Sequence, residues 1–494
     1  MLNNSTTDNN TTILDRNCFL YHNLVKIFKA LVQSLTSWIG ASIRFFLTTM
    51  GILWFTAYHA AGQEGPIPTS VERTIDGGYT FMRNGSPYYV RGAGGIEYIA
   101  DVARFGGNSI RTWSHDNAKE ILDEAHRHGI TVMMGLWVQH ERHGFDYDNA
   151  ERVASQLEMF SQVIDQLKDH PALLAWSVGN EVDLNYSNTN VWYAVEDIAA
   201  MIQRKDPNHP VTTITAGLDS TEVFLIKERC PSLDFYGINT YGDLDKLPSQ
   251  IERYGWTGPY MITEWGPNGH WEVARANWGA PIEQTSGSKA ESYGRRYAEK
   301  IYAERRTCLG SYAFLWGQKQ ETTSTWYGLH TEKGKPTETL WSVSQSWQGH
   351  FSQADRIPAP ASIVSIGGAP PVLRAGEKVA VPVDFMIADR VKGAKLWYEI
   401  LPESTDIKSG GDAESRPPSL AYKSLGRIKP GTYRGNPLAF RTPSKPGPYR
   451  IFVYLEAEGF VAYGNLPFFV EPRGPQERPS RALEFMPIPL NDQP

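Results

Sequence analysis

Short apolar segments alternate with amphipathic helical patterns along the chain from Gly78 to about residue 350. Strands with no polar face are buried on both sides, which is typical of parallel strands covered by helices. Eight such strands in roughly 270 residues predict a (β/α)8 barrel rather than an open sheet. The predicted strands are one that ends near Arg91 and Gly92, followed by 108–113, 130–138, 173–179, 211–216, 233–241, 260–266 and 310–317.

The open-sheet alternative would favour a glycine-rich phosphate-binding loop after the first strand. The segment "RGAGGIEYI" (91–99) lies at that place, but it lacks the GxGxxG spacing of a dinucleotide site. Before it, "YTFMRNGSPYYVRG" contains two alternating runs around Asn84–Gly85, which predicts a β-hairpin. The barrel therefore stays the preferred fold, and we expect a β-hairpin at its start.

The pattern changes after Ser352, where a segment rich in Pro, Gly and Ala precedes alternating strands without a helical pattern. These strands predict a small C-terminal β-sandwich, which we expect to be immunoglobulin-like. The expected organisation is a polar tail with a signal peptide or membrane anchor (1–63), the catalytic barrel (64–352), the sandwich (353–473) and a Pro-rich tail (474–494).

The N-terminal region contains an apolar run, 45–61, which follows basic residues and ends in small ones. This pattern is typical of a secretory signal or of a single anchor, with membrane anchoring possible through residues 30–61. A buried helix of the folded domain is the alternative. We therefore expect an exported protein that is secreted, periplasmic or anchored at the outer face of the membrane.

Charge and composition narrow the class of ligand. The net charge of −6 provides no basic surface for nucleic acid. His115, His140 and His143 lack the spacing of metal ligands on one helix, so we expect no metal and no other cofactor. Aromatic residues make up 12% of the chain, which fits either a large core or a cleft lined with rings that bind sugars.

In a barrel of this kind, functional side chains lie at the carboxyl ends of the strands. The predicted strand ends present amides and an arginine suited to sugar hydroxyls, aromatic rings suited to sugar faces, and two carboxylates. The candidate binding residues are Arg111, His115, Trp137, His140, Asn180, Asn239, Tyr241, Trp265 and Trp316, and the candidate catalytic residues are Glu181 and Glu264. Trp271 and Trp278 lie on a predicted loop, where unburied rings would also favour sugar binding.

Two glutamates among these residues indicate the chemistry of the site. Glu181 follows the fourth predicted strand and Glu264 ends the seventh, so both side chains can approach a ligand in the barrel mouth. Glycoside hydrolysis needs such a pair, one to protonate the leaving oxygen and one to attack or to activate water. A separation of about 5–5.5 Å gives retention of configuration, and about 6.5–9.5 Å gives inversion.

The segments "WSVGNE" (176–181) and "MITEWG" (261–266) resemble the acid/base and nucleophile signatures of the clan A retaining glycoside hydrolases. Over about residues 78–350 the barrel is most similar to that of glycoside hydrolase family 2, and "NSIRTWSHD" and "NTYGD" resemble its second and sixth strands. The resemblance implies that Glu181 is the acid/base and Glu264 the nucleophile.

The same resemblance implies roles for their neighbours. Asn180 would bind the sugar 2-hydroxyl, Tyr241 and Arg111 would orient Glu264 and favour its charged form, and Trp316 would form the floor of the first subsite. We expect a retaining β-glycosidase that hydrolyses β-linked glucans or other oligo- or polysaccharides. A transglycosylase (glucanosyltransferase) using the same site and a non-catalytic carbohydrate-binding barrel are the alternatives.

Overall fold

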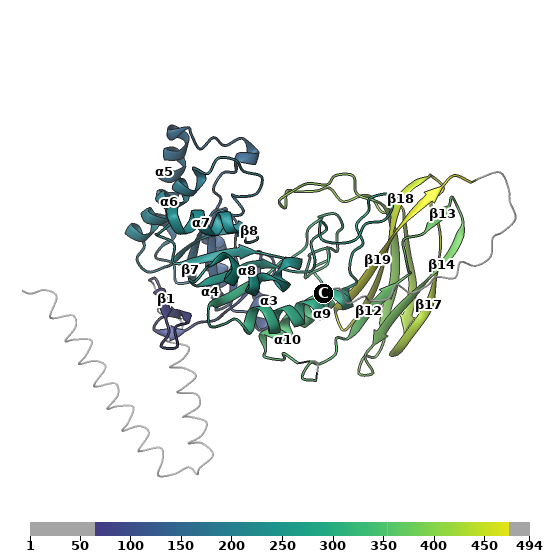
Figure 1. The fold of residues 1–494 in the computed structure, drawn as a ribbon. Helices are drawn as coiled ribbons and strands as arrows, with labels where there is room; N and C mark the ends of the chain where they lie inside the picture. The colour runs from purple at the N-terminus through teal and green to yellow at the C-terminus, as the bar shows by residue number, and fades with distance from the viewer. Residues whose placement is uncertain (1–64, 353, 474–494) are drawn as a thin grey trace, which may run out of the picture. The chain divides into compact units, whose positions relative to one another are not determined.

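The computed structural model describes residues 65–352 and 354–473 (Figure 1). Eight parallel strands close into a barrel in the order β10-β11-β4-β5-β6-β7-β8-β9, which confirms the predicted barrel. The strands are β4 (Val90–Gly94), β5 (Ser109–Arg111), β6 (Thr131–Leu136), β7 (Leu173–Val178), β8 (Val211–Ala216), β9 (Phe235–Asn239), β10 (Tyr260–Trp265) and β11 (Cys308–Ala313). Several are shorter than their apolar segments, and β11 ends three residues before Trp316.

Helices follow the strands and cover the outside of the barrel (Figure 1). They are α3 (Ile99–Arg104), α4 (Ala118–Arg127), α5 (Ala150–Leu167), α6 (Val191–Lys205), α7 (Ser220–Arg229), α8 (Leu247–Tyr254), α9 (Ser286–Arg296) and α10 (Glu338–Trp347). A π-helical turn, Tyr297–Tyr302, continues α9, and short 3-10 turns occur at Glu141–His143 and Gly242–Asp245. The side chains of Asn149, Asp219, Thr285 and Thr337 accept hydrogen bonds from backbone N–H groups at four helix starts.

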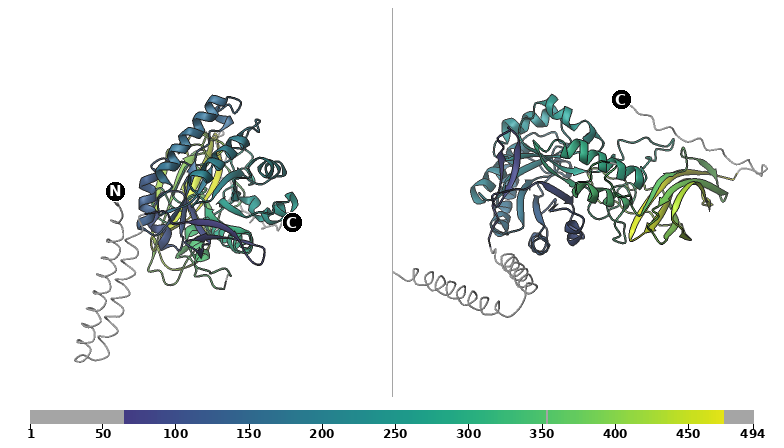
Figure 2. Two further views of the ribbon diagram at one scale, coloured as in Figure 1. Left: turned by 90° about the vertical axis from the view of Figure 1, so that its left-hand side faces the viewer. Right: turned by 90° about the horizontal axis from the view of Figure 1, so that it is seen from below.

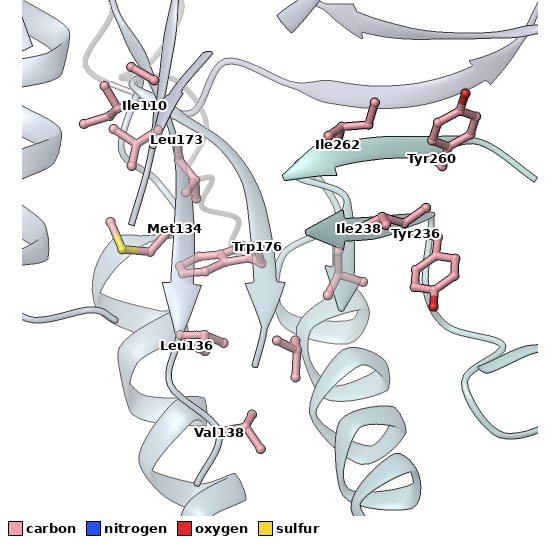
Figure 3. Close-up of a cluster of buried hydrophobic side chains, with 14 of the residues drawn as sticks. Ile110, Met134, Leu136, Val138, Leu173, Trp176, Tyr236, Ile238, Tyr260 and Ile262 are labelled. Atoms are coloured by element: carbon pink, nitrogen blue, oxygen red, sulfur yellow. The ribbon is translucent and has the colours of Figure 1, made fainter. Parts of the chain in front are cut away.

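The main core lies between the barrel strands and their helices. Figure 3 shows part of it, with Ile110, Met134, Leu173 and Trp176 projecting from strands. A smaller cluster fills the barrel interior, and Phe81 joins it with its ring 5.3 Å from that of Phe235. Polar residues lie beyond these clusters, at the carboxyl ends of the strands.

A three-stranded sheet that precedes the barrel strands brings Phe81 to this interior cluster. It comprises β1 (Thr69–Arg73), β2 (Tyr79–Arg83) and β3 (Ser86–Pro87). Asn84 and Gly85 both have positive φ, 50° and 71°, between β2 and β3, as a type I′ turn requires. The predicted hairpin at Asn84–Gly85 is therefore confirmed.

The C-terminal part consists of two sheets without helices between residues 354 and 473 (Figure 2). One has the order β12-β14-β17 and the other β13-β19-β18-β15-β16. Their strands are β12 (Ala361–Ile366), β13 (Val372–Arg374), β14 (Lys378–Ile387), β15 (Ala394–Pro402), β16 (Ala421–Ile428), β17 (Gly431–Arg441), β18 (Gly447–Ala457) and β19 (Phe460–Glu471). Both sheets share one buried cluster, as in a sandwich. An immunoglobulin-like class stays a prediction.

The predicted N-terminal signal or anchor, including residues 30–61, and the Pro-rich tail 474–494 lie outside the described residues. Among the residues that are described, no helix is both long enough and apolar enough to cross a membrane. Export of the protein therefore stays a prediction.

Candidate active site

A cavity of about 750 Å³ opens at the carboxyl ends of the barrel strands. Its volume lies within the range of sites that enclose small ligands. Side chains from several strand ends line it, including Trp113, Trp137, Asn180, Glu181, Asn239, Tyr241, Glu264 and Phe314. Both candidate catalytic glutamates thus face the same space.

Three hydrogen-bond donors converge on the buried carboxylate of Glu264. Arg111 Nη1 lies 3.0 Å from Oε1, and the indole Nε1 of Trp113 donates to the same oxygen at 2.7 Å. The hydroxyl of Tyr241 donates to Oε2 at 2.8 Å. Both oxygens of Glu264 therefore accept hydrogen bonds, and one of these bonds comes from a guanidinium group.

Arg111 is the centre of this network, and its side chain is fully buried. Besides Glu264, it donates to the carbonyl of Thr263 at 2.7 Å and to Oδ1 of Asn239 at 3.2 Å. It also donates to Oδ1 of Asn180. Because the oxygen of Asn180 is occupied in this way, its NH2 group is the part left to face a ligand.

Glu181 follows β7 through Gly179, whose φ of 79° places it in the left-handed region. A Cβ at Gly179 would lie 2.9 Å from Cγ1 of Val182, so this tight turn favours glycine. Asn239 Nδ2 donates to Oε1 of Glu181 at 2.8 Å. Burial, and then the negative charge of Glu264, raise the pKa of Glu181 to about 7. Glu181 can therefore carry a proton near neutral pH.

Aromatic rings surround Tyr241 on one side of the cavity. Its ring centroid lies 5.3 Å from that of Tyr327, 5.7 Å from that of Trp271 and 5.9 Å from that of Phe314. Burial and the nearby charge of Glu264 raise the pKa of Tyr241 well above its ordinary value, so its hydroxyl keeps the proton that it donates. Trp271 is 55% exposed, so its ring can contact a ligand, as the sequence predicts.

Five of the nine predicted binding residues do not line the cavity; Arg111 contacts Glu264 instead, and Trp265, Trp316, His115 and His140 lie elsewhere. Trp265 follows Glu264 and points to the opposite face of β10, where it packs against Tyr293 at 4.9 Å. Trp316 stacks on Trp347 of α10 at 5.9 Å, because β11 ends earlier than predicted. Neither ring can contact a ligand in the cavity. The prediction that Trp316 forms the floor of the first subsite is therefore wrong.

The two predicted histidines also lie behind the cavity surface. The ring of His115 lies 6.0 Å from that of Phe160 in α5. His140 is buried and stacks between Trp137 at 4.8 Å and His143 at 5.4 Å. Burial and the charge of Arg142 lower the pKa of His140 to about 4, so a neutral ring supports Trp137 from behind.

Trp278, in contrast to Trp271, packs against Phe469 of β19 at 5.8 Å and not in the cavity. The sequence analysis also missed Trp113 and Phe314, which lie just past the ends of β5 and β11 and line the cavity. It gave no signal for residues 408–412, which reach the cavity from the C-terminal part. Among the described residues, no group of three His, Cys, Asp or Glu side chains is arranged to hold a metal ion.

The fold and the paired glutamates define a barrel of the glycoside hydrolase type. Residues 99–271 match the sequence model described as "Glycosyl hydrolases family 2, TIM barrel domain". This part of the chain is therefore similar to the clan A glycoside hydrolase barrels of family 2.

Several known proteins are similar to parts of this chain. A protein named beta-glucuronidase from Paenibacillus borealis is 22% identical over 262 residues, which cover 48% of this chain and 42% of the relative. The human protein of the same name is 24% identical over 182 residues, which cover 33% of this chain and 26% of the relative. The alignments thus span less than half of each of these relatives. A solved beta-glucuronidase structure from Faecalibacterium prausnitzii is 20% identical with a TM-score of 0.45, covering 57% of this chain and 51% of that one.

Proposed function

We propose that the protein is a retaining β-glycosidase that uses Glu264 as nucleophile and Glu181 as acid/base. The observation that carries the proposal is the contrast between the two carboxyl groups in one cavity. Glu264 accepts three hydrogen bonds, one of them from the buried Arg111. Glu181 has a pKa raised to about 7. A carboxylate held by three donors beside a second carboxyl group that can carry a proton near neutral pH matches the two roles that glycoside hydrolysis needs.

In the first step, a carboxylate oxygen of Glu264 attacks the anomeric carbon while the bond to the leaving oxygen breaks. The proton of Glu181 passes to that oxygen. In the second step, the Glu181 carboxylate takes a proton from water, and the water oxygen displaces Glu264 from the anomeric carbon. The enzyme returns to its starting state, and two inversions give net retention. Transfer to a sugar hydroxyl in place of water would use the same groups.

We propose a neutral sugar as the substrate, with a β-glucoside or β-glucan favoured. Among the described residues that line the cavity, carboxylates outnumber lysines; the former are Glu181, Asp243, Glu264, Glu272, Glu321 and Asp412, and the latter Lys319 and Lys408. Lys319 pairs with Glu321 at 2.8 Å and Lys408 with Asp406 at 2.8 Å. A cavity of this charge disfavours an anionic sugar, in contrast to what the names of the relatives would suggest.

Turnover of a panel of 4-nitrophenyl β-glycosides that includes the glucoside, galactoside, mannoside and glucuronide tests the proposal. We expect activity on a neutral glycoside, with retention of configuration by proton NMR. Glu264→Ala and Glu181→Gln should each lower kcat strongly, and a small anion such as azide should restore part of the activity of Glu264→Ala by occupying the vacated space.

Glu222→Gln is the matched control, because Glu222 is buried, its pKa is also raised by burial to about 7, and it does not line the cavity. Unchanged turnover in both glutamate variants would overturn the site. A preference for the glucuronide would overturn the substrate class alone. Longer products at high donor concentration, detected by mass spectrometry, would identify a transglycosylase.

A further inference from the structure

A long loop of the C-terminal part forms one wall of the cavity. It joins β15 to β16 and comprises residues 403–420, which we call the β15–β16 loop. Connections longer than about 12–15 residues without secondary structure are uncommon in compact domains and are usually functional. The tip of this loop, residues 408–412, lines the same cavity as Glu181 and Glu264.

The barrel holds this loop from two sides of its mouth. After β6, Arg142 Nη1 donates to the carbonyl of Ser409 at 3.3 Å and lies 3.3 Å from Oδ2 of Asp412. After β11, Lys319 Nζ donates to the carbonyl of Gly411 at 2.9 Å. Because β6 and β11 are not neighbours in the barrel, the loop crosses the space between two separate strand ends.

Glu414 fixes the loop to the barrel backbone. Its Oε2 accepts from the N–H of Thr322 at 2.6 Å, and its Oε1 accepts from the N–H of Lys408 at 2.9 Å. Asp406 closes the neck of the loop by accepting from the N–H and the hydroxyl of Ser415, both at 2.9 Å. The tip is therefore held in one conformation before a ligand arrives, which lowers the entropy lost on binding.

The tip lies against the barrel at Gly410, whose φ is 62°. A Cβ at this position would lie 2.8 Å from both Cδ2 of Leu184 and Nη2 of Arg142. The positive φ favours glycine here, and a larger residue would have to displace the ends of these two side chains. The contact with Leu184 places the tip beside the segment that follows Glu181.

We propose that the tip of the β15–β16 loop forms a second sugar subsite, adjacent to the one occupied by the reacting sugar, with Lys408 and Asp412 as specificity-determining residues. The inference rests on the proposed glycosidase function. The hydrogen bonds found for residues 403–420 do not reach Glu181 or Glu264, so the tip contacts a neighbouring unit. Its ligand is a neutral β-linked oligosaccharide of at least two units.

The chemistry of the tip fits this ligand. The ammonium group of Lys408 and the carboxylate of Asp412 provide a donor and an acceptor for sugar hydroxyls at the cavity wall. Trp137 lines the cavity with its ring half-buried. That ring gives an apolar face for the carbon side of a sugar, as is usual in pockets that combine aromatic walls with few polar groups.

Lys408→Ala and Asp412→Ala test the subsite when compared with Lys429→Ala. Lys429 is an exposed lysine just beyond the opposite end of β16 and away from the cavity, so it controls for the loss of a lysine in the same domain. For each protein, kcat/KM is measured on the best aryl β-monoglycoside and on β-linked oligosaccharides of the same sugar with two to six units. Isothermal titration of those oligosaccharides into each protein with Glu264→Ala added, which prevents turnover by the proposed mechanism, measures binding alone.

We expect kcat/KM on the oligosaccharides to fall about tenfold more than on the aryl glycoside in Lys408→Ala and Asp412→Ala, with weaker oligosaccharide binding. Lys429→Ala should match the wild type in both measurements. Equal losses on both substrates, or no loss, would overturn the subsite. Oligosaccharide binding that depends on Lys408 without turnover of any substrate would overturn the proposed hydrolase while supporting the subsite. Turnover of the aryl glycoside without oligosaccharide binding would overturn the subsite alone.

Discussion

The indole N–H of Trp113 donates a hydrogen bond of 2.7 Å to Oε1 of Glu264, the oxygen that Arg111 also contacts. The ring of Trp113 lies 5.8 Å from that of Phe314. Trp113 therefore links the aromatic wall of the cavity to the carboxylate that we propose as the nucleophile. Its role can be separated from simple packing because its N–H can be removed while an aromatic ring is kept.

Trp113→Phe should lower kcat on an aryl β-glycoside roughly 10- to 100-fold, since a hydrogen bond to a charged group contributes about 1.5–3 kcal/mol. Steady-state kinetics on the active substrate measures the loss. Trp278→Phe is the matched control, because Trp278 lies away from the cavity and its Nε1 has no hydrogen-bond partner in the described chain. An equal loss in both variants would show that the effect is general to tryptophan replacement.

The pH dependence of kcat/KM should have an alkaline limb near pH 7. The proposed acid must carry its proton, and burial together with the charge of Glu264 raises the pKa of Glu181 to about 7. Activity is therefore expected to fall as the pH rises through that value. The profile is measured with an aryl glycoside at substrate concentrations well below KM.

Glu181→Gln should remove this alkaline limb, because its amide does not titrate. A substrate with a good leaving group, such as a dinitrophenyl glycoside, keeps enough residual turnover to record the profile. An alkaline limb that persists unchanged in Glu181→Gln would assign it to another group.

Two local patterns determine how much of the site the sequence could predict: the alternation of apolar strands with helices, and the polar residues at the strand ends. The apolar segments predicted the barrel, and the carboxyl ends of its strands predicted that Arg111, Asn180, Asn239 and Tyr241 would meet Glu264. The structure brings these side chains together in one network. Parallel strands all end at the same edge of a barrel, so this part needed only local patterns.

Two kinds of information were not in those patterns. Residue period two decides which face a side chain occupies, so Trp265, next to the inward-facing Glu264, lies in the core, and Trp316 lies beyond the end of β11. The contact of residues 408–412 with the barrel mouth depends on how the C-terminal sheets pack on the barrel. No local periodicity encodes such a contact between segments far apart in the sequence.

Glu181→Gln should also change stability in a pH-dependent way. The folded-state pKa of Glu181 is raised from 4.5 to about 7, so the folded protein holds this proton more tightly than the unfolded chain. The free energy of unfolding therefore falls as the pH rises from about 4.5 through 7. Gln carries no such cost, because it does not ionise.

Thermal unfolding at pH 5 and pH 8 measures this effect. The melting temperature of Glu181→Gln relative to wild type should be more favourable at pH 8 than at pH 5. Replacement of a catalytic residue typically lowers activity while it raises stability. A difference between the two proteins that stays constant with pH would mean that Glu181 does not titrate in this range.

The buried ion pair of Glu283 and Lys289 supports the contact between the barrel and the C-terminal sheets. Lys289 Nζ lies 2.6 Å from Oε1 of Glu283, and both side chains are almost fully buried. Oε2 of Glu283 accepts from Nδ2 of Asn465 in β19 at 2.6 Å. Nearby, Arg450 of β18 donates to the carbonyl of Pro281 at 2.8 Å. The pair thus links the barrel to the domain that carries the β15–β16 loop.

Lys289→Ala should destabilise the protein by about 3–5 kcal/mol, because it leaves the carboxylate of Glu283 buried without its cation. Lys119→Ala is the control, since Lys119 pairs with Asp123 at 2.7 Å on the surface, where a pair contributes about 0–1 kcal/mol. Urea unfolding followed by tryptophan fluorescence measures both. If the two variants lost similar stability, the buried pair would not be what holds the two parts together. If Lys289→Ala also lowered oligosaccharide turnover more than aryl glycoside turnover, the position of the loop would depend on this contact.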